Sequence, residues 1–329
     1  MLVGFVSIVL SFYLVACLAV VQQKSPDFTH KSVGEIIAAV SDGDKVALRS
    51  AFKQLSHSRQ LRQAGDEIAR IILNSPDAKI YHLAKLTYLY NLLPPDHRQA
   101  PEVFFELSSR DSKILRQVAW ETAKLKPSAR MTSLILRRVN SLIGSDNDEE
   151  LFKPHIAEAI AANRVTKLYS VVRAGLMHNQ HESFVRAMQE LNPKRASSDF
   201  LDYLALASVD DLRQQSPTSV NILACVKIFE HLEKYPVSVH HRRFESLFWY
   251  AISRNLVFSE AAITILERYY GQHAGYLAQL LSRLPYWAQH SFVENLARVL
   301  TPLSRQFLVV LKQKTSGVDV IDEINQLIR

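Results

Sequence analysis

Apolar residues recur at intervals of three and four along most of the chain, the spacing that places side chains on one face of an α-helix. In the segment 111–126, DSKILRQVAWETAKLK, this pattern predicts a buried stripe formed by Ile114, Leu115, Val118, Ala119, Thr122 and Leu125. Asp111 precedes the stripe, where its carboxylate can accept hydrogen bonds from the free N–H groups of the first turn. We therefore expect a helix over 111–125 that packs this stripe against a neighbouring helix.

The same reading predicts roughly eighteen helices after the N-terminal segment. Several prolines, including Pro285 and Pro302, fall at the joins or in the first turns, where the missing N–H group costs nothing. The expected ranges are 33–41, 44–55, 59–74, 77–93, 98–109, 111–125, 128–143, 148–162, 164–177, 180–191, 196–214, 217–234, 238–255, 258–270, 273–283, 285–299, 302–314 and 318–328.

A short signature repeats within the first half of the chain. It consists of an Asp, three residues, an apolar residue and a basic one, and it occurs as DKVALR at Asp44, DAKIYH at Asp77 and DSKILR at Asp111. A looser copy, DEELFK, begins at Asp148, so the successive spacings are 33, 34 and 37 residues. Self-similarity at this period is typical of helical repeat proteins, in which each helix pair buries its apolar face against the next pair.

The unit at 111–125 resembles the second helix of a HEAT-type repeat. Asp111, Leu115, Arg116 and Ala119, followed by Leu125, match that pattern, and the resemblance extends over about residues 32–165. It implies an α-solenoid of stacked antiparallel helix pairs. We therefore expect an all-α, HEAT-like solenoid. Such an architecture presents long binding surfaces but does not specify an activity.

Composition agrees with a helical chain. The sequence has 9 Gly among 329 residues and no sustained alternation of apolar and polar positions, so it lacks the usual signals of a β-sheet. The acidic stretch 146–150 follows Gly144, and the Asp-led signature fades after it. We therefore divide the folded body into N-terminal repeats over 32–145 and aromatic-rich C-terminal helical repeats over 146–329.

The first 21 residues contain no charged side chain and are almost wholly apolar, which is typical of a targeting or anchoring segment. Within them, Leu14-Val15-Ala16-Cys17 resembles the lipobox of bacterial lipoproteins. The resemblance implies a signal peptide over 1–16, cleavage before Cys17 and attachment of membrane lipid to its sulfur, with 17–31 as a tether. Because Leu18 stands where an Asp would signal inner-membrane retention, the resemblance further implies an outer-membrane lipoprotein facing the periplasm. The alternative is an uncleaved inner-membrane anchor, since about 21 apolar residues can span a bilayer.

The formal net charge is +7 and the isoelectric point is near 9.3. A basic chain suits an anionic partner, but the basic clusters, such as Arg242-Arg243, are short and isolated. We therefore expect a generally basic surface and no nucleic-acid partner.

Aromatic residues are concentrated between Tyr235 and Phe307. They indicate either a groove for an extended peptide or glycan or, as we favour, bulky packing in the core of the last helices. Tyr286 and Trp287 follow Pro285 in a first turn and are expected to be the most exposed. The candidate partner-binding residues are Trp249, Tyr286, Trp287, Arg242 and Arg243.

Catalytic and metal-binding patterns are weak. The sequence lacks a nucleophile elbow, a phosphate loop, a dinucleotide fingerprint and a zinc-protease motif. His178-x-x-His181-Glu182 offers ligands on one turn, but no further ligand is signalled, so a solvated helix end is the expected role. Gly175-Leu176-Met177 is similar to a segment of lytic transglycosylases, whose catalytic Glu lies upstream, and Glu158 is the nearby candidate. Cys225 lies in an apolar stripe and is expected to be buried and inert.

These observations predict a non-catalytic, membrane-anchored periplasmic scaffold or adaptor that binds protein partners, without a cofactor or a metal. By analogy it would serve as an accessory subunit of an envelope or secretion complex. The alternative is a cell-wall glycan-binding or lytic transglycosylase-like protein. The identity of the partner and the oligomeric state are not specified by the sequence.

Overall fold

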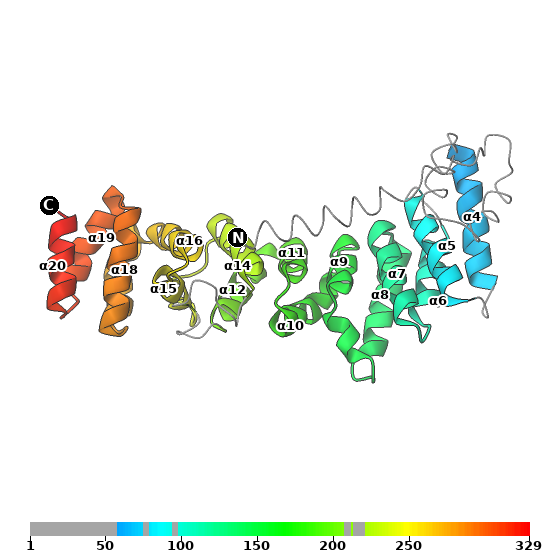
Figure 1. Ribbon diagram of the computed structural model, residues 1–329, viewed down its shortest axis with the longest axis horizontal. Coiled ribbons are helices and arrows are strands. Elements are labelled where there is room, and N and C mark those ends of the chain that lie inside the picture. Colours follow the sequence, from blue (N-terminus) through cyan, green and yellow to red (C-terminus); the bar gives the residue numbers. More distant parts are fainter. Residues whose placement is uncertain (1–57, 75–78, 94–97, 207–211, 213–220) are drawn as a thin grey trace, which may run out of the picture. The chain divides into compact units, whose positions relative to one another are not determined.

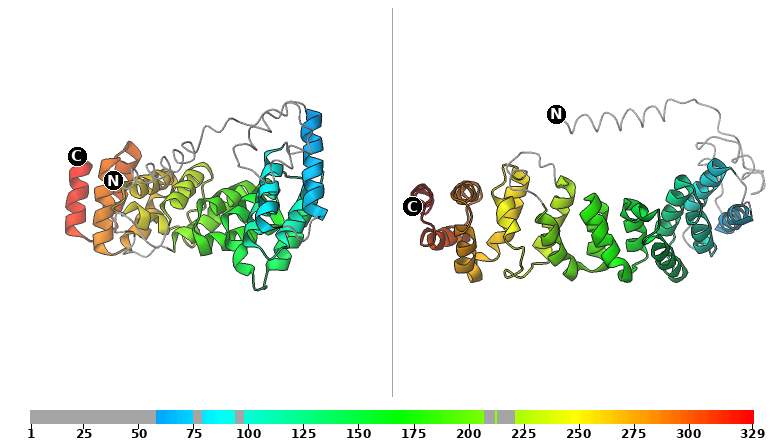
Figure 2. Two further views of the ribbon diagram at one scale, coloured as in Figure 1. Left: turned by 45° about the vertical axis from the view of Figure 1, so that its right-hand side comes forward. Right: turned by 90° about the horizontal axis from the view of Figure 1, so that it is seen from below.

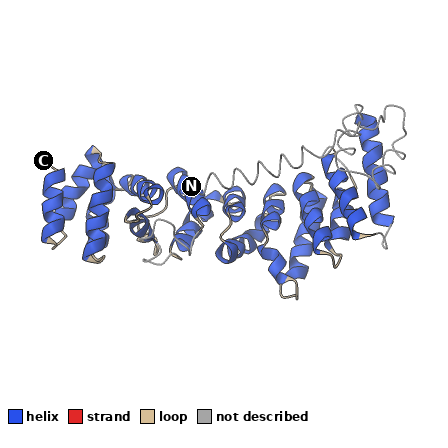
Figure 3. Ribbon diagram, viewed as in Figure 1, coloured by secondary structure: helices blue, strands red, loops and turns tan. Residues whose placement is uncertain are grey.

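A computed structural model describes residues 58–74, 79–93, 98–206, 212 and 221–329 of the chain. These residues form sixteen α-helices and two short 3-10 helices, and no strand occurs among them (Figure 1, Figure 3). The expected all-α class is confirmed for this part of the protein. The apolar N-terminal segment with Cys17, the tether, the helices expected at 33–41 and 44–55, the signature at Asp44 and the first two residues of the signature at Asp77 lie outside the described residues. The rest of the Asp77 signature lies at the start of the helix Ile80–Leu92, where the Tyr81 side chain is 72 % exposed.

The chain divides into two compact units, Met1–Thr122 and Ala123–Arg329, and each is considered by itself. The boundary expected between residues 145 and 146, where the Asp-led signature fades, stays a prediction. Among the described residues, no helix combines the length and the apolar character needed to cross a membrane.

The described part of the first unit is built from α4 (Ser58–Asn74), α5 (Ile80–Leu92), α6 (Ala100–Ser108) and the larger part of α7 (Lys113–Leu125). Helix α4 packs against both α5 and α6. Phe104 of α6 meets Trp120 of α7 edge to face, with 5.0 Å between the ring centroids, and both side chains are fully buried. These rings form part of the core of the first unit.

Helix α7 shows that the predicted stripe is rotated by part of a turn. Leu115, Ala119 and Thr122 are buried as expected, but Ile114 is 42 % exposed and Leu125 is 46 % exposed. Trp120 and Ala123 complete the buried face instead. Because Ile114 and Leu115 are adjacent, helical periodicity allows the buried face of α7 to be centred on either residue. The face that is buried is the one that includes Leu115 and the large indole ring of Trp120. The start of α7 also differs from the prediction, because Ser112, not Asp111, accepts a hydrogen bond from the backbone N–H of Leu115.

The second unit contains the remaining described helices (Figure 2). They are α8 (Ala129–Leu142), η1 (Asp148–Phe152), α9 (Pro154–Ala162), η2 (Thr166–Leu168), α10 (Tyr169–Asn179), α11 (Glu182–Leu191), α12 (Pro193–Leu204), α14 (Ile222–Lys234), α15 (Ser246–Ala251), α16 (Leu256–Glu267), α17 (Tyr270–Ser282), α18 (Tyr286–Arg298), α19 (Pro302–Lys312) and α20 (Val318–Leu327).

Alternate helices of the second unit pack against one another. Helices α9, α11, α14 and α16 make contact in that order, and α16 contacts α18. Helices α10, α12 and α15 also make contact in order, so that two rows of helices lie side by side (Figure 1). Below, the pocket row denotes α9, α11, α14 and α16, and the opposite row denotes α10, α12 and α15.

Local sequence accounts for most of the helix starts in this unit. Side-chain caps accept hydrogen bonds from the first turns of the helices, as the cap residue types predict; they are Ser128, His181, Asn192, Asn221, Asn255 and Thr301. Pro154, Pro193 and Pro302 occupy first turns, where the absent N–H group is not needed.

Two buried asparagines join successive helices. The side-chain amide of Asn163 donates to the carbonyl oxygens of Ala123 at 2.7 Å and Ala159 at 3.0 Å, and its oxygen accepts from the N–H group of Ser128. Asn295 of α18 likewise donates to Ala251 at the end of α15 and to Ser253 beyond it. Asn163 thereby supplies a donor to the Ala123 carbonyl near the end of α7, and Asn295 supplies one to the Ala251 carbonyl at the end of α15, where helical carbonyls lack an intrahelical partner.

Two predicted helices are interrupted for identifiable reasons. The segment 148–162 forms η1 and then α9, because Pro154 disfavours helical geometry at Lys153, whose ψ is 137°. Within 238–255 only α15 is an α-helix. The side chain of Ser238 accepts from the backbone N–H of His240, and His241 accepts from Arg243, so these side chains hold turns in place of a helix.

The aromatic-rich segment packs mainly in the core, as we favoured from the sequence. Phe244, Phe248, Tyr250, Phe258 and Phe292 are each less than 2 % exposed. The Tyr270 and Phe307 rings are stacked at 4.3 Å and join α17 to α19. Cys225 is also fully buried, 3.8 Å from the Tyr250 hydroxyl, and burial raises the pKa of its thiol to about 12. The prediction of a buried cysteine is therefore confirmed, and the raised pKa agrees with an unreactive thiol.

Candidate binding surface

The two arginines predicted to bind a partner lie before α15 and differ in their surroundings. Arg242 is within 3.1 and 3.2 Å of the two carboxylate oxygens of Asp202 on α12. Asp202 also accepts from Arg173 of α10, so Arg242 belongs to an ion-pair network of the opposite row. The Arg243 side chain is exposed. The role of both arginines in partner binding stays a prediction.

The three predicted aromatic residues separate into a pair and a single ring. Trp249 of α15 and Trp287 of α18 are half-buried. Their ring centroids are 6.1 Å apart, and the planes of the two rings are inclined by 40°. Tyr286 is 39 % exposed, as expected for the first turn. Its hydroxyl accepts a hydrogen bond from the N–H of Val320, and its ring occupies the space that a side chain at Gly317 would take. Trp249 and Trp287 therefore meet, whereas Tyr286 packs toward α20.

A first hollow, of about 230 Å³, lies between α9 and α11. Glu158 is on its wall, 2.8 Å from the Nζ of Lys124 and 2.7 Å from the hydroxyl of Ser183. Burial acts to raise the pKa of Glu158, but the hydrogen bonds from Lys124 and Ser183 outweigh burial and lower it below its ordinary value. A glycosidase acid needs a raised pKa, so the electrostatics oppose the catalytic role considered for this residue.

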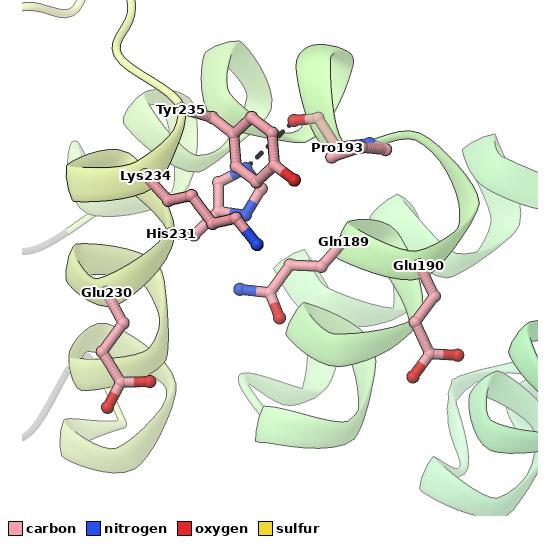
Figure 4. A pocket seen from close by; sticks show the side chains of 7 residues that line it. All are labelled: Gln189, Glu190, Pro193, Glu230, His231, Lys234 and Tyr235. Carbon is pink, nitrogen blue, oxygen red and sulfur yellow. Dashed lines mark hydrogen bonds between the residues drawn. The ribbon is translucent and has the colours of Figure 1, made fainter.

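A second hollow, of about 330 Å³, lies between α11 and α14 (Figure 4). Gln189 and Lys234 point toward one another across it, and Glu190 and Glu230 extend from the two helices at its edge. The hollow is therefore lined mainly by polar and charged groups.

His231, which lines the second hollow, is in contact with the buried Ser197. The Oγ of Ser197 is 3.1 Å from the Nε2 of His231, and the same nitrogen is 3.0 Å from the carbonyl oxygen of Pro193. Because a carbonyl oxygen only accepts, the contact with Pro193 requires a proton on Nε2, and burial lowers the pKa of His231 below its ordinary value. Ser197 in turn donates to the carbonyl of Tyr235. A catalytic base needs a free lone pair on this nitrogen, so the arrangement is a structural link between α12 and α14.

A third hollow, of about 160 Å³, lies between α14 and α16. Its floor is apolar, with Phe229 and Ile265 buried and Val257 55 % exposed at the edge. Glu230 and Glu233 are the charged residues that line it. This hollow combines an apolar floor with acidic walls.

Neighbouring hollows along the pocket row share lining residues. Glu190 lines the first and the second, and Glu230 lines the second and the third. Within the described part of the chain, Glu190 and Glu233 have no hydrogen-bonded or charged partner, while Glu230 lies 2.8 Å from the Nζ of Lys227. An extended surface with unneutralised carboxylates thus runs along the pocket row of a chain whose net charge is positive.

The segment His178-x-x-His181-Glu182, for which a helix-end role was expected, makes structural contacts at the junction of α10 and α11. His178 packs on the Phe152 ring at 4.4 Å, the Nδ1 of His181 accepts from the N–H of Ser183 to cap α11, and Glu182 pairs with Arg186. Throughout the residues that the structure describes, His, Cys, Asp and Glu side chains do not gather in a group of three that could hold a metal ion.

Gly175 of the transglycosylase-like segment also has a packing role. The ring of Phe184 lies where a side chain at this position would be, so the missing Cβ lets α10 and α11 approach closely. The need for Gly at this position is therefore explained without a glycan.

Comparisons of the chain with protein-family models, curated protein sequences and solved structures found no match. The candidate surface consequently rests on its own geometry. Sequence reasoning missed Glu190, Glu230 and Glu233, although all three lie on polar faces of predicted amphipathic helices. The sequence shows that Glu230 and Glu233 are three residues apart and therefore share a face of α14. It does not show that α11 and α16 pack on either side of α14.

Proposed function

We propose that this protein is a non-catalytic helical-repeat scaffold that binds a protein partner along the pocket row. The observation that carries this proposal is the succession of three hollows along one row of helices, in which neighbouring hollows share Glu190 or Glu230 as a lining residue. A partner that follows the row can contact α9, α11, α14 and α16 in succession, as ligands of stacked helical repeats do. The finer assignment, a HEAT-like α-solenoid, is part of the proposal and is supported by the repeated Asp-led signature.

Two features of the surface support binding over catalysis. Glu158 is held ionised by Lys124 and Ser183, and the Nε2 of His231 donates to a backbone carbonyl. Neither group is poised to donate or accept a proton in a reaction at pH 7. The chemistry that remains is recognition through charge, hydrogen bonds and apolar contact.

The proposal places the scaffold at a bacterial outer membrane, facing the periplasm, anchored by lipid on Cys17, with a partner that belongs to an envelope complex. The lipobox resemblance supports this placement, and an uncleaved inner-membrane anchor is the alternative. Intact mass spectrometry of the protein purified from its native membrane tests it. A lipidated chain that begins at Cys17 is expected, and accumulation of the unprocessed precursor for Cys17→Ser. A wild-type mass equal to the complete chain without lipid would contradict the lipoprotein assignment.

A glycan-binding function is the second candidate, because Trp249 and Trp287 meet at 6.1 Å and stay half-exposed. Co-sedimentation with purified cell wall distinguishes the two functions. The scaffold proposal expects that the wild-type protein does not bind the cell wall. Binding by the wild type that is lost in Trp249→Ala would favour the glycan-binding function.

The binding surface itself is tested by obstructing it with bulky side chains that carry no charge. Glu190→Trp and Thr264→Trp, combined in one chain, place indole rings on exposed positions of α11 and α16. The matched control combines Ser170→Trp and Ser198→Trp, which are exposed positions of the opposite row. Proteins that co-purify with each full-length variant from native membranes are quantified by mass spectrometry. The proposal expects a partner that is lost from the first variant and kept by the control, and identical co-purification would refute it.

A further inference from the structure

The hollow between α14 and α16 differs from the other two in its chemistry. Its charged lining residues are both acidic, whereas Lys124 and Arg186 line the first hollow and Lys234 lines the second. Phe229, Ile265 and Val257 give it an apolar floor and an exposed apolar edge. A ligand that fits this hollow must therefore carry an apolar group for the floor and, next to it, a positive charge for the two carboxylates.

The size of this hollow suits one large apolar side chain. Its volume of about 160 Å³ is comparable with an apolar cavity of about 150 Å³ that accepts benzene. Val257 and Ala261 are four residues apart on α16, and Glu230 and Glu233 are three apart on α14, so one helical face on each side borders the hollow. The hollow thus has an apolar edge along α16 and an acidic edge along α14.

The carboxylates are available to a ligand. Glu233 is exposed and has no charged partner among the described residues, and Glu230 shares its charge with Lys227 alone while remaining exposed. Two carboxylates three residues apart repel one another, so a cation placed between them is favoured. The formal net charge of the whole chain is +7, so the negative charge at this hollow is opposite in sign to the net charge of the protein.

We infer that the hollow between α14 and α16 binds a cationic amphipathic segment of the protein partner, with an apolar side chain on Phe229 and Ile265 and a Lys or Arg beside Glu233. This inference rests on the proposed scaffold function and specifies the chemistry of its partner. The apolar side chain leaves water on entering the hollow, and the cation relieves the repulsion between the two carboxylates. In a partner helix, residues three or four apart supply both groups from one face.

The test measures fluorescence anisotropy of labelled helical peptides with the full-length protein in a nonionic detergent, against a detergent-only blank. The first peptide has Leu on one face with Lys three and four residues away. The second replaces every Lys by Glu, and the third scrambles the first so that it has the same charge without an apolar face. The inference expects binding of the first peptide only, and weaker binding at high salt.

Variants locate the peptide on the protein. Glu233→Lys and Val257→Glu are each expected to weaken binding of the first peptide by roughly tenfold, because each removes one of the two required interactions. Glu149→Lys in η1 and Val318→Glu in α20 make the same chemical changes at other exposed positions and are expected to keep the wild-type affinity.

Several outcomes overturn the inference. They are tighter binding of the acidic peptide, equal binding of the scrambled peptide, equal loss in the control variants, and self-association of the chain that Val257→Glu abolishes, which would make a second copy the occupant. If the indole variants lose a native partner but the basic peptide does not bind, the scaffold function stands and the inferred chemistry is wrong. If the peptide binds as expected while the indole variants keep every partner, the site chemistry stands and the scaffold function fails.

Discussion

Asn163→Asp is expected to be among the most damaging conservative changes in the second unit. The substitution keeps the size and shape of the side chain but replaces the donating amide by a carboxylate oxygen. That oxygen would face the carbonyl oxygens of Ala123 and Ala159, which the amide now approaches at 2.7 and 3.0 Å. The site is 8 % exposed, so water cannot replace the lost donors.

The magnitude follows mainly from the Ala123 carbonyl, which loses its donor, because the Ala159 carbonyl keeps the backbone N–H of Asn163 at 3.1 Å. Leaving a buried acceptor unsatisfied costs about 1–3 kcal/mol, and the new carboxylate oxygen also faces both carbonyl oxygens, so we expect Asn163→Asp to lower the free energy of unfolding by about 3 kcal/mol at neutral pH. For a unit of this size, about 1 kcal/mol corresponds to about 2–4 °C, which gives a fall in melting temperature of about 6–12 °C. The introduced carboxyl group can donate one hydrogen bond when it is protonated, so its pKa in the folded state is raised. The stability that the protonated form provides is lost as pH rises from about 4 through that raised pKa.

The assay is thermal unfolding of the full-length protein, followed by far-ultraviolet circular dichroism at acidic and neutral pH. Asn140→Asp is the matched control, because Asn140 is exposed on α8 and is expected to change stability by less than about 0.5 kcal/mol. Equal melting temperatures for the two variants, or a difference that does not shrink at acidic pH, would refute the role assigned to Asn163.

Three further predictions use the same measurement of unfolding. Leu115→Asp should destabilise the protein by more than about 3 kcal/mol, whereas Ile114→Asp on the exposed face should not. Equal destabilisation by the two substitutions would instead support the stripe expected from the sequence, which contains both residues. Gly175→Ala should cost about 1–3 kcal/mol by overlap with the Phe184 ring, and an unchanged stability would show that the helices can separate freely. Burial raises the pKa of Glu323, so stability should fall as pH rises from about 4.3 through that raised value. The fall should be smaller in Glu323→Gln, and identical pH profiles would contradict it.

The sequence predicted helices best where their ends depend on neighbouring residues. Helices α8, α18, α19 and α20 begin and end within two residues of the expected ranges, since caps and prolines such as Pro302 act locally. Prediction failed at 238–245, where side chains of Ser238 and His241 compete with the helix for backbone N–H groups. It also failed in the stripe of α7, because helical periodicity alone cannot choose between adjacent Ile114 and Leu115.

The candidate surface was hidden for a different reason. Glu190 and Glu230 are 40 residues apart and are each an ordinary polar residue of an amphipathic helix. They line one hollow only because α11 packs directly against α14, which is a property of the register between helices. The aromatic residues drew attention in the sequence because their type is informative, yet most of them are core residues. Cys17 lies outside the described residues, so the lipoprotein assignment stays a prediction.

Site-specific photo-cross-linking in native cells tests the central claim most directly. A photoreactive residue is introduced singly at Glu190, Glu233 and Thr264 on the pocket row, and at Ser170 and Ser198 on the opposite row, all of which are exposed. The account predicts that one partner protein is captured from all three positions of the pocket row and from neither position of the opposite row. Capture of that partner from the opposite row, or an absence of cross-links along the pocket row, would contradict it.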